Sequence, residues 1–205
     1  MSKVDLSKEL KECYKAKKKP NLVYVPEGKF LSILGKGDPN GEEYQEAIGA
    51  LYSFAYTLKF HFKGQDKDFK VMPLEGLWWI EDGIFDMINP APREDWRWRA
   101  FIRVPDYVSE EAMQELVTDL SEKKGEKVCE VSLWDFHEGI SAQIMHIGPY
   151  SEETPTINTL HEWVEKSGYR LRGNHHEIYL SDPRRSKPEN LKTIIKHPLD
   201  ELGLG

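Results

Sequence analysis

The sequence predicts an α+β fold in which one arrangement of a helix and strands occurs twice. In each half a strand ends at a glycine turn, and a helix with apolar residues three and four positions apart follows. An apolar, aromatic strand then carries one glutamate, Glu75 in residues 71–80 and Glu177 in residues 174–183. A shift of 109 residues aligns the apolar positions of the two helices, pairing Ile48 with Ile157, Leu51 with Leu160, Phe54 with Trp163 and Ala55 with Val164. The ordered match of strand, turn, helix and glutamate strand indicates a duplication.

The first half begins with a short extension. Residues 4–18 place Leu6, Leu10 and Tyr14 on one stripe, which predicts an amphipathic helix ending before Pro20. We therefore expect an N-terminal helix or extension at residues 1–19 and a single domain at 20–205. Alternation, turn residues and helical spacing then predict strands at 22–25 and 29–34, a helix at 42–61, and strands at 71–80 and 96–104.

The second half follows a connecting helix at 109–124, which Gly125 ends. Strands are predicted at 128–134 and 140–147, and the turn Gly148-Pro-Tyr150 leads into a helix at 154–166. Further strands are expected at 169–172, 175–180 and 191–196. The pseudo-repeats are thus about 20–105 and 128–198.

Composition excludes several classes of function. The chain has 205 residues and a net charge of -7, so it is long enough to bury a core and too acidic for broad nucleic-acid binding. The basic run at 15–19 is interpreted as a solvated helix end. Cys13 and Cys129 form neither a metal spacing nor a disulfide framework, and no signal peptide or membrane span is recognisable. We expect a cytoplasmic protein without a nucleic-acid or membrane partner.

Strand alternation predicts where the carboxylates lie. Ile178 and Leu180 are expected to pack on the preceding helix, which sends Glu177 and Tyr179 to the opposite face. The same rule places Leu74, Trp78 and Ile80 toward the first helix and Glu75, Leu77 and Trp79 away from it. The face away from the helices would be concave and hold both glutamates among aromatic residues, as small-molecule pockets do. In the alternative interpretation, each glutamate pairs with an arginine such as Arg97, Arg99 or Arg172.

Other chemistries find little support. No serine lies in a Gly-x-Ser-x-Gly context, no glycine-rich phosphate loop is present, and the adjacent His175 and His176 point to opposite faces of a strand. We expect no metal and no cofactor.

Residues 146–183 resemble a known family. The segment His146-Ile-Gly148-Pro-Tyr150, a helix with Leu160 and Trp163, Gly168, and then His176-Glu177-Ile-Tyr-Leu-Ser-Asp-Pro183 is similar to the GyrI-like small-molecule-binding domain. This domain also occurs as the effector-binding half of drug-sensing MerR- and AraC-type regulators. The segment Phe101-Ile-Arg-Val-Pro-Asp-Tyr-Val108, followed by an acidic helix, resembles the stand-alone branch.

The resemblance implies a duplicated SHS2 module, each copy β-α-β-β, with an antiparallel sheet, helices on one face and a central ligand cleft. It implies that Glu177 is the pocket carboxylate, and the internal repeat extends this role to Glu75. We expect ligand contacts from Tyr179, Trp79, Trp98, Leu77 and Tyr150. The implied partner is a hydrophobic or cationic aromatic small molecule, bound by a monomer or homodimer.

Two functions are compatible with the resemblance. Some stand-alone members are cyclopropanoid cyclopropyl hydrolases, which open the strained ring of DNA-alkylating natural products. A non-enzymatic drug sequestrant or the effector domain of a regulatory system is the alternative. In a hydrolase, Glu177, with Glu75, would position or deprotonate a water, and an apolar pocket would raise the pKa of such a base. A third class, a structural protein, predicts arginine-paired glutamates and no pocket.

Overall fold

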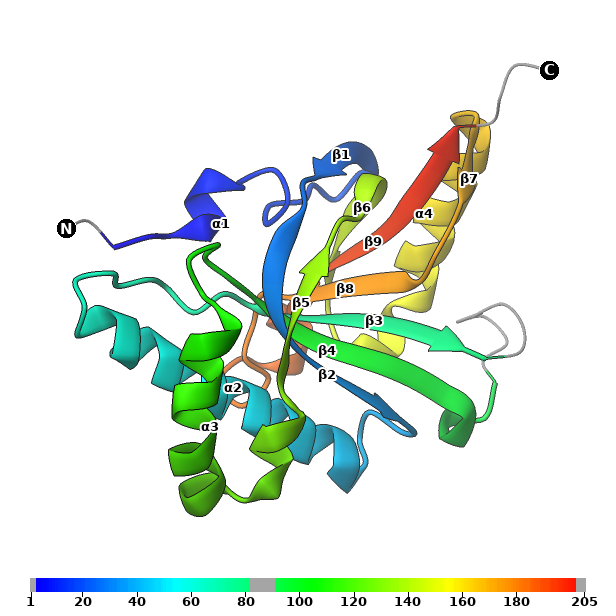
Figure 1. Cartoon of the computed structure of the whole chain (residues 1–205). Helices are drawn as coiled ribbons and strands as arrows, with labels where there is room; N and C mark the ends of the chain where they lie inside the picture. The colour runs from blue at the N-terminus through cyan, green and yellow to red at the C-terminus, as the bar shows by residue number, and fades with distance from the viewer. Residues whose placement is uncertain (1–2, 82–90, 202–205) are drawn as a thin grey trace.

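The computed structural model describes residues 3–81 and 91–201 and has an α+β fold with a large antiparallel sheet (Figure 1). The strands are β1 (Asn21–Val25), β2 (Gly28–Lys36), β3 (Leu74–Ile80), β4 (Trp96–Val104), β5 (Ser132–Phe136), β6 (Gly139–Ile147), β7 (Tyr169–Leu171), β8 (His175–Tyr179) and β9 (Lys192–Glu201). The α-helices are α1 (Leu6–Glu9), α2 (Glu42–Lys63), α3 (Glu110–Lys124) and α4 (Thr154–Lys166). The predicted fold class is confirmed.

The strand order is symmetric about its central pair. The sheet runs β1-β6-β9-β8-β3-β4-β2-β5, with β7 paired to β9, so β3 and β8 meet in the middle. The two halves also exchange edge strands: β1 of the first half pairs with β6 of the second, and β5 of the second half pairs with β2 of the first. This arrangement is what a duplication with exchanged edge strands produces.

Helices α2 and α4 cover one face of the sheet, which we call the helix face. Helix α2 buries the stripe that its apolar spacing predicts, and this stripe packs with residues of β2 and β4 such as Ile33 and Trp98. Helix α4 packs Ile157, Leu160 and Val164 with residues of β6 and β9, namely Ala142, Ile144, Ile195 and Leu199. Helix α3 lies beside α2, and its first turn is capped by the Ser109 hydroxyl, which accepts from the Ala112 N–H. The strands β3 and β8 thus lie between the strands that the two helices cover.

The other face of the sheet, the far face, receives the N-terminal segment. The predicted helix at 4–18 is wrong beyond its first turn, since only Leu6–Glu9 is helical. The following residues hydrogen-bond to the sheet instead: Gln143 Nε2 donates to the Glu12 carbonyl at 2.9 Å, and the Met145 N–H donates to the Lys17 carbonyl at 2.7 Å. Tertiary hydrogen bonds therefore replace those of the predicted helix. The predicted strand at 128–134 also starts late, because residues 126–130 form a 3₁₀ turn that buries Val128.

The register of β3 against β8 corrects the predicted faces. Glu75 lies opposite Ile178, and Gly76 lies opposite Glu177. Directly opposed residues of an antiparallel pair share a face. Trp78 identifies the helix face, because its ring lies 5.4 Å from that of Tyr44 on α2.

Two consequences follow from that register. Glu177 and Tyr179 lie on the helix face with Trp78, whereas Glu75, Leu77 and Trp79 lie on the far face. The prediction was right for β3 and wrong for β8. It assumed that Ile178 and Leu180 pack on α4, but α4 packs on β6 and β9 and leaves β8 beneath the space between the helices.

The internal equivalence of the glutamates is also wrong. Gly28 and Gly139 are the first residues of β2 and β6, and the pairing register can be followed from them through β4 and β9 to the central strands. Glu75 then corresponds to His176, and Gly76 corresponds to Glu177. Glu75 and Glu177 therefore lie on opposite faces of the sheet.

Among the described residues, no helix is long and apolar enough to cross a membrane.

Candidate functional site

Glu177 lies on the helix face at the centre of the sheet and is buried, with 7% of the residue's surface exposed. Its Oε1 lies 2.9 Å from Nε2 of His175, which precedes it by two positions and shares its face. A buried carboxylate is costly unless it is hydrogen-bonded or paired. His175 provides that partner.

Glu153, the residue before α4, brings a second carboxyl group close to Glu177. It is buried, and burial together with the negative charge of Glu177 raises the pKa of Glu153 to about 10. Burial also acts to raise the pKa of Glu177, but hydrogen bonds from His175 and Tyr179 and the charge of His175 hold it below its ordinary value. At neutral pH the pair therefore holds one protonated and one ionised carboxyl group.

This pair changes the expected chemistry of the site. The predicted increase in the pKa of Glu177 is wrong, because the sequence did not reveal its partners. Glu153 was missed altogether: in the run Ser151-Glu-Glu153-Thr-Pro155 it resembles an exposed acid in a first helical turn. Only the folded structure shows that Glu153 is buried and lies beside Glu177.

Aromatic residues surround the carboxyl pair. Trp78 Nε1 donates to the Tyr179 hydroxyl at 3.1 Å, and the rings of Tyr150 and Tyr179 lie edge to face at 5.6 Å. Tyr150 is 38% exposed, so it lies at the solvent side of the group. Gly76 is opposite Glu177, and a Cβ there would lie 3.0 Å from Trp78 Nε1 and 3.2 Å from the Tyr179 hydroxyl. Electron-rich rings beside an ionised carboxylate are suited to a cationic or polarised aromatic ligand.

The far face carries a different polar group centred on His176. Its Nδ1 lies 2.8 Å from Oε1 of Glu138, and its Nε2 lies 3.1 Å from Oε2 of Glu75. Tyr14 of the N-terminal segment donates to Glu75 Oε1 at 2.8 Å. Because each ring nitrogen faces a carboxylate, the ring carries both protons and a positive charge.

The electrostatics agree with that assignment. Burial opposes ionisation of Glu138, but the charge and hydrogen bond of His176, together with the charge of Lys196, lower the pKa of Glu138 to about 2. Burial also opposes the charge on His176, yet Glu138 and Glu75 raise the pKa of its ring. The far face therefore contains an ion-paired network.

An aromatic cluster adjoins this network on the far face. Phe101 lies 5.4 Å from the ring of His176, and Trp134 and Phe136 stack at 4.4 Å. The guanidinium of Arg99 lies 4.1 Å from the centre of the Trp134 ring. The cluster comprises Phe30, Leu77, Phe101, Trp79, Trp134 and Phe136.

The predicted site residues thus form two groups instead of one. Glu177, Tyr179 and Tyr150 come together on the helix face, and Glu75, Leu77 and Trp79 lie on the far face. Trp98 joins neither group, since it is fully buried beneath α2 with its ring 4.9 Å from Tyr44.

The arginine-paired alternative is wrong within the described parts of the chain. Arg97 pairs with Glu81, Arg99 donates to the Ser32 hydroxyl, and Arg172 lies beside Asp200. Neither Glu75 nor Glu177 has an arginine partner there. In residues 3–81 and 91–201, no group of three or more His, Cys, Asp or Glu side chains is placed to hold a metal ion.

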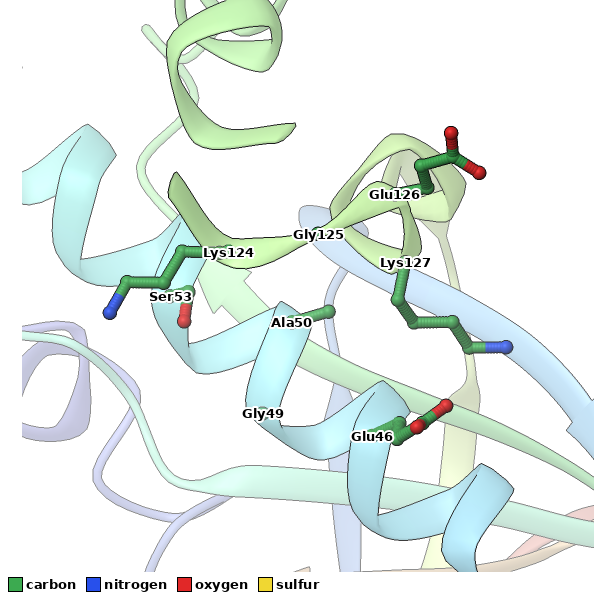
Figure 2. A pocket seen from close by; sticks show the side chains of 8 residues that line it. All are labelled: Glu46, Gly49, Ala50, Ser53, Lys124, Gly125, Glu126 and Lys127. Atoms are coloured by element: carbon green, nitrogen blue, oxygen red, sulfur yellow. The ribbon is translucent and has the colours of Figure 1, made fainter. Parts of the chain in front are cut away.

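Two surface pockets lie elsewhere. One, of about 460 Å³, lies between α2 and the end of α3. Figure 2 shows its lining residues, Glu46, Gly49, Ala50, Ser53, Lys124, Gly125, Glu126 and Lys127. Another of about 360 Å³ lies along β6 and the start of α4, lined by Lys18, Ile144, Met145, His146, Ile147, Pro155, Thr156 and Thr159. Neither is lined by Glu75 or Glu177.

Comparison with known proteins identifies the family. The GyrI-like small molecule binding domain matches residues 18–200. The chain belongs to this family of small-molecule-binding domains. No curated protein sequence matches the chain.

Solved structures include close relatives of this GyrI-like chain. An uncharacterized conserved protein from Listeria innocua is 43% identical with a TM-score of 0.89, and the match covers 97% of this chain and 100% of the other. A hydrolase from the same organism is 40% identical with a TM-score of 0.84, over 97% and 100% of the two chains. The EcmrR C-terminal domain is 14% identical with a TM-score of 0.59, over 89% and 98%, so it shares the fold alone.

Proposed function

We propose that this protein binds planar, hydrophobic or cationic aromatic small molecules beside Glu177 and hydrolyses those that are reactive electrophiles. The observation that carries the proposal is the Glu153–Glu177 pair, in which one carboxyl group keeps its proton and the other is ionised. Paired carboxyl groups with separated pKa values are a common arrangement for acid–base catalysis. The hydrolase from Listeria innocua, similar over nearly the whole chain, supports an enzymatic role.

The aromatic surroundings support the ligand class. Tyr179, Tyr150 and Trp78 present ring surfaces around a carboxylate, which favours a flat ring carrying positive charge or an electron-poor centre. Of the residues predicted from sequence, this site uses Glu177, Tyr179 and Tyr150. Trp98 would support it from beneath through Tyr44.

For a cyclopropane conjugated to a carbonyl group, Glu177 and Glu153 supply the base and the acid that ring opening by water requires. Glu177 accepts a proton from water while the water oxygen forms a bond to a cyclopropane carbon. The strained carbon–carbon bond breaks, its electron pair moves into the conjugated system, and the carbonyl oxygen takes the proton of Glu153. A proton transfer from Glu177 to Glu153 then restores the pair, and the net change is addition of one water.

Turnover of a cyclopropane-bearing, DNA-alkylating compound tests this proposal. Glu177→Gln is expected to lower kcat by roughly 10²–10⁴-fold, as loss of a general base does. Glu152→Gln is the matched control, because Glu152 is adjacent to Glu153 but exposed. Chromatography of the ring-opened product after incubation with each variant measures the effect. Equal turnover by Glu177→Gln and the control would remove Glu177 from the mechanism.

A non-enzymatic sequestrant or effector domain is the second candidate. The lowered pKa of Glu177 favours it, because a weak base is better suited to holding a cation than to deprotonating water. Binding of a cationic aromatic dye that weakens in Glu177→Gln, without turnover of any cyclopropane compound by the wild type, would select this function.

The wider setting is also proposed. The symmetric strand order supports two SHS2 modules in one domain spanning 20–205, of which residues 82–90 and 202–205 lie outside the described structure. We place the protein in the cytoplasm as a monomer or homodimer without a cofactor. Size-exclusion chromatography with light scattering measures the oligomeric state.

A further inference from the structure

The far face buries an unbalanced set of charges. Five residues there with a carboxyl, guanidinium, imidazole or ammonium group expose 5% or less of their surface: Glu75, Arg103, Glu138, His176 and Lys196. With the His176 ring positive between its two carboxylates, three of the five are cations and two are anions. A buried charge without a partner is strongly destabilising. These five buried side chains therefore carry one positive charge in excess.

The nearby N-terminal segment does not supply the missing charge. Cys13 and Tyr14 lie within the electrostatic reach of this group, and the charges of Lys196 and Arg103 both act on the Cys13 thiol. Burial nevertheless raises the pKa of both side chains, so thiol and phenol stay neutral at pH 7. The N-terminal segment covers the charges without balancing them.

Two of the cations also have unused hydrogen-bond donors. Lys196 Nζ and Arg103 Nη1 are buried and have no hydrogen-bond partner among the described residues. Lys196 is opposite His176 across β8 and β9 and opposite Gln143 across β6 and β9, so it lies in the same polar row. The acceptors Glu138 Oε2 and Gln143 Oε1 likewise have no partner in the part of the chain that the structure describes. Such a set fits a ligand that carries both an anionic group and a hydroxyl.

The aromatic cluster supplies the other half of a site. Arg103 lies 5.2 Å from the centre of the Phe30 ring, and Phe30 lies edge to face with Phe101 at 5.3 Å. Trp79, Trp134 and Phe136 are only partly buried, so solvent reaches this end of the cluster. Aromatic side chains of this kind stack on planar rings.

We propose that the far face is a second ligand site, distinct from the Glu177 site, which binds a planar aromatic acid with one negative charge. The ring lies against the Phe30–Phe101–Trp134 cluster, and the anionic group accepts from Lys196 Nζ. A hydroxyl beside the acid donates to Glu138 or Gln143.

Calorimetric titration with 3-hydroxy-2-naphthoate tests the proposal, with 3-hydroxy-2-naphthamide as the neutral probe of the same shape. The acid is expected to bind at least tenfold more tightly than the amide. Lys196→Met keeps an unbranched side chain, one atom shorter, and removes its charge, and it should abolish that preference. Lys192→Met, on the exposed part of the same strand, is the matched control and should retain it.

Melting curves provide a second readout that a structural ion pair would not give. Removal of an uncompensated buried ammonium should leave the melting temperature of ligand-free Lys196→Met equal to or above that of the wild type. A lower melting temperature would show that Lys196 is already balanced and would overturn the proposal. Equal affinity for acid and amide in the wild type would also overturn it.

The result is separable from the proposed function. Glu177→Gln should leave the affinity for the naphthoate unchanged. If Glu177→Gln removes naphthoate binding and Lys196→Met does not, the acid binds on the helix face and the second site does not exist. Absence of cyclopropane turnover bears only on the proposed function.

Discussion

Adjacent residues of strand β8 point to opposite faces of the sheet, and the two faces differ in how they shift the pKa values of their carboxyl groups. His175 and Glu177 point to the helix face, where Glu153 adds a second carboxyl group and the pKa of Glu153 rises to about 10. His176 points to the far face, where it lies between two carboxylates and the pKa of Glu138 falls to about 2. Both sites are buried and both contain glutamate and histidine. A histidine lowers the carboxyl pKa on both faces, at Glu177 and at Glu138, whereas burial and the charge of Glu177 raise the pKa of Glu153.

The difference also separates stability from function. A carboxylate paired with a buried imidazolium stabilises the fold at neutral pH, whereas two carboxyl groups in contact destabilise it and persist where chemistry uses them. On this basis the far-face network holds the sheet and the N-terminal segment together, and the helix-face pair is the one for which we propose chemistry.

The largest expected effect is on the far face. Glu138→Gln should lower the free energy of unfolding by about 3–5 kcal/mol at pH 7, because it leaves the buried His176 ring with one carboxylate. The folded pKa of Glu138 lies below its ordinary value of 4.5, so the contribution is present above pH 4.5 and is lost as the pH falls toward 2. Urea unfolding at pH 7 and pH 3 measures this difference. The control Glu130→Gln changes an exposed carboxylate paired with Lys127, and equal effects of the two variants would refute the network's role.

The helix face should respond with the opposite sign. Glu153→Gln should raise the free energy of unfolding by up to about 3 kcal/mol at pH 7, because the amide does not resist burial as an ionising carboxyl group does. The folded pKa of Glu153 is raised, so its contribution is complete below pH 4.5 and declines as the pH rises toward 10. The gain in Glu153→Gln should therefore grow from pH 5 to pH 9 in thermal melts. A gain that is independent of pH would contradict the raised pKa.

Tyr14→Phe should have a smaller effect. It removes the hydrogen bond to Glu75 Oε1 and leaves a buried carboxylate oxygen unpaired, which costs about 2 kcal/mol. Chemical denaturation measures it, and protease digestion should show earlier cleavage within residues 10–19 if the contact holds the segment down. Tyr24→Phe is the control, because its hydroxyl bonds to His137 at the exposed surface.

The smallest expected effect is spectroscopic. A cationic aromatic ligand should quench the fluorescence of Trp78, which donates to Tyr179, and leave that of Trp79 on the far face little changed. Trp78→Phe should remove most of the response and Trp79→Phe should retain it. The reverse result would place the cationic ligand on the far face and remove the distinction between the two sites.

The sequence alone determined most of the elements and the family. Apolar residues at helical spacing predicted α2 and α4, alternation predicted β4 with its observed bounds, and the segment from His146 to Pro183 indicated the GyrI-like domain that matches residues 18–200. These features depend on local periodicity and turn chemistry, which neighbouring residues carry. The same rules placed Glu75, Leu77 and Trp79 away from α2 correctly.

Only the tertiary structure decided which groups meet. Residues 10–17 do not form the predicted helix, because Glu12, Tyr14 and Lys17 make hydrogen bonds with the sheet. Glu177 lies on the helix face because β8 pairs with β3 in the register that sets Glu177 opposite Gly76, and because α4 packs on β6 and β9 instead of on Ile178; alternation within β8 contains neither fact. Glu153 interacts with Glu177, which is 24 residues later in the sequence, and Glu138 interacts with His176, which is 38 residues later. Strand alternation separates two faces, but the choice of face and the pKa of each group depend on residues brought close only by the fold.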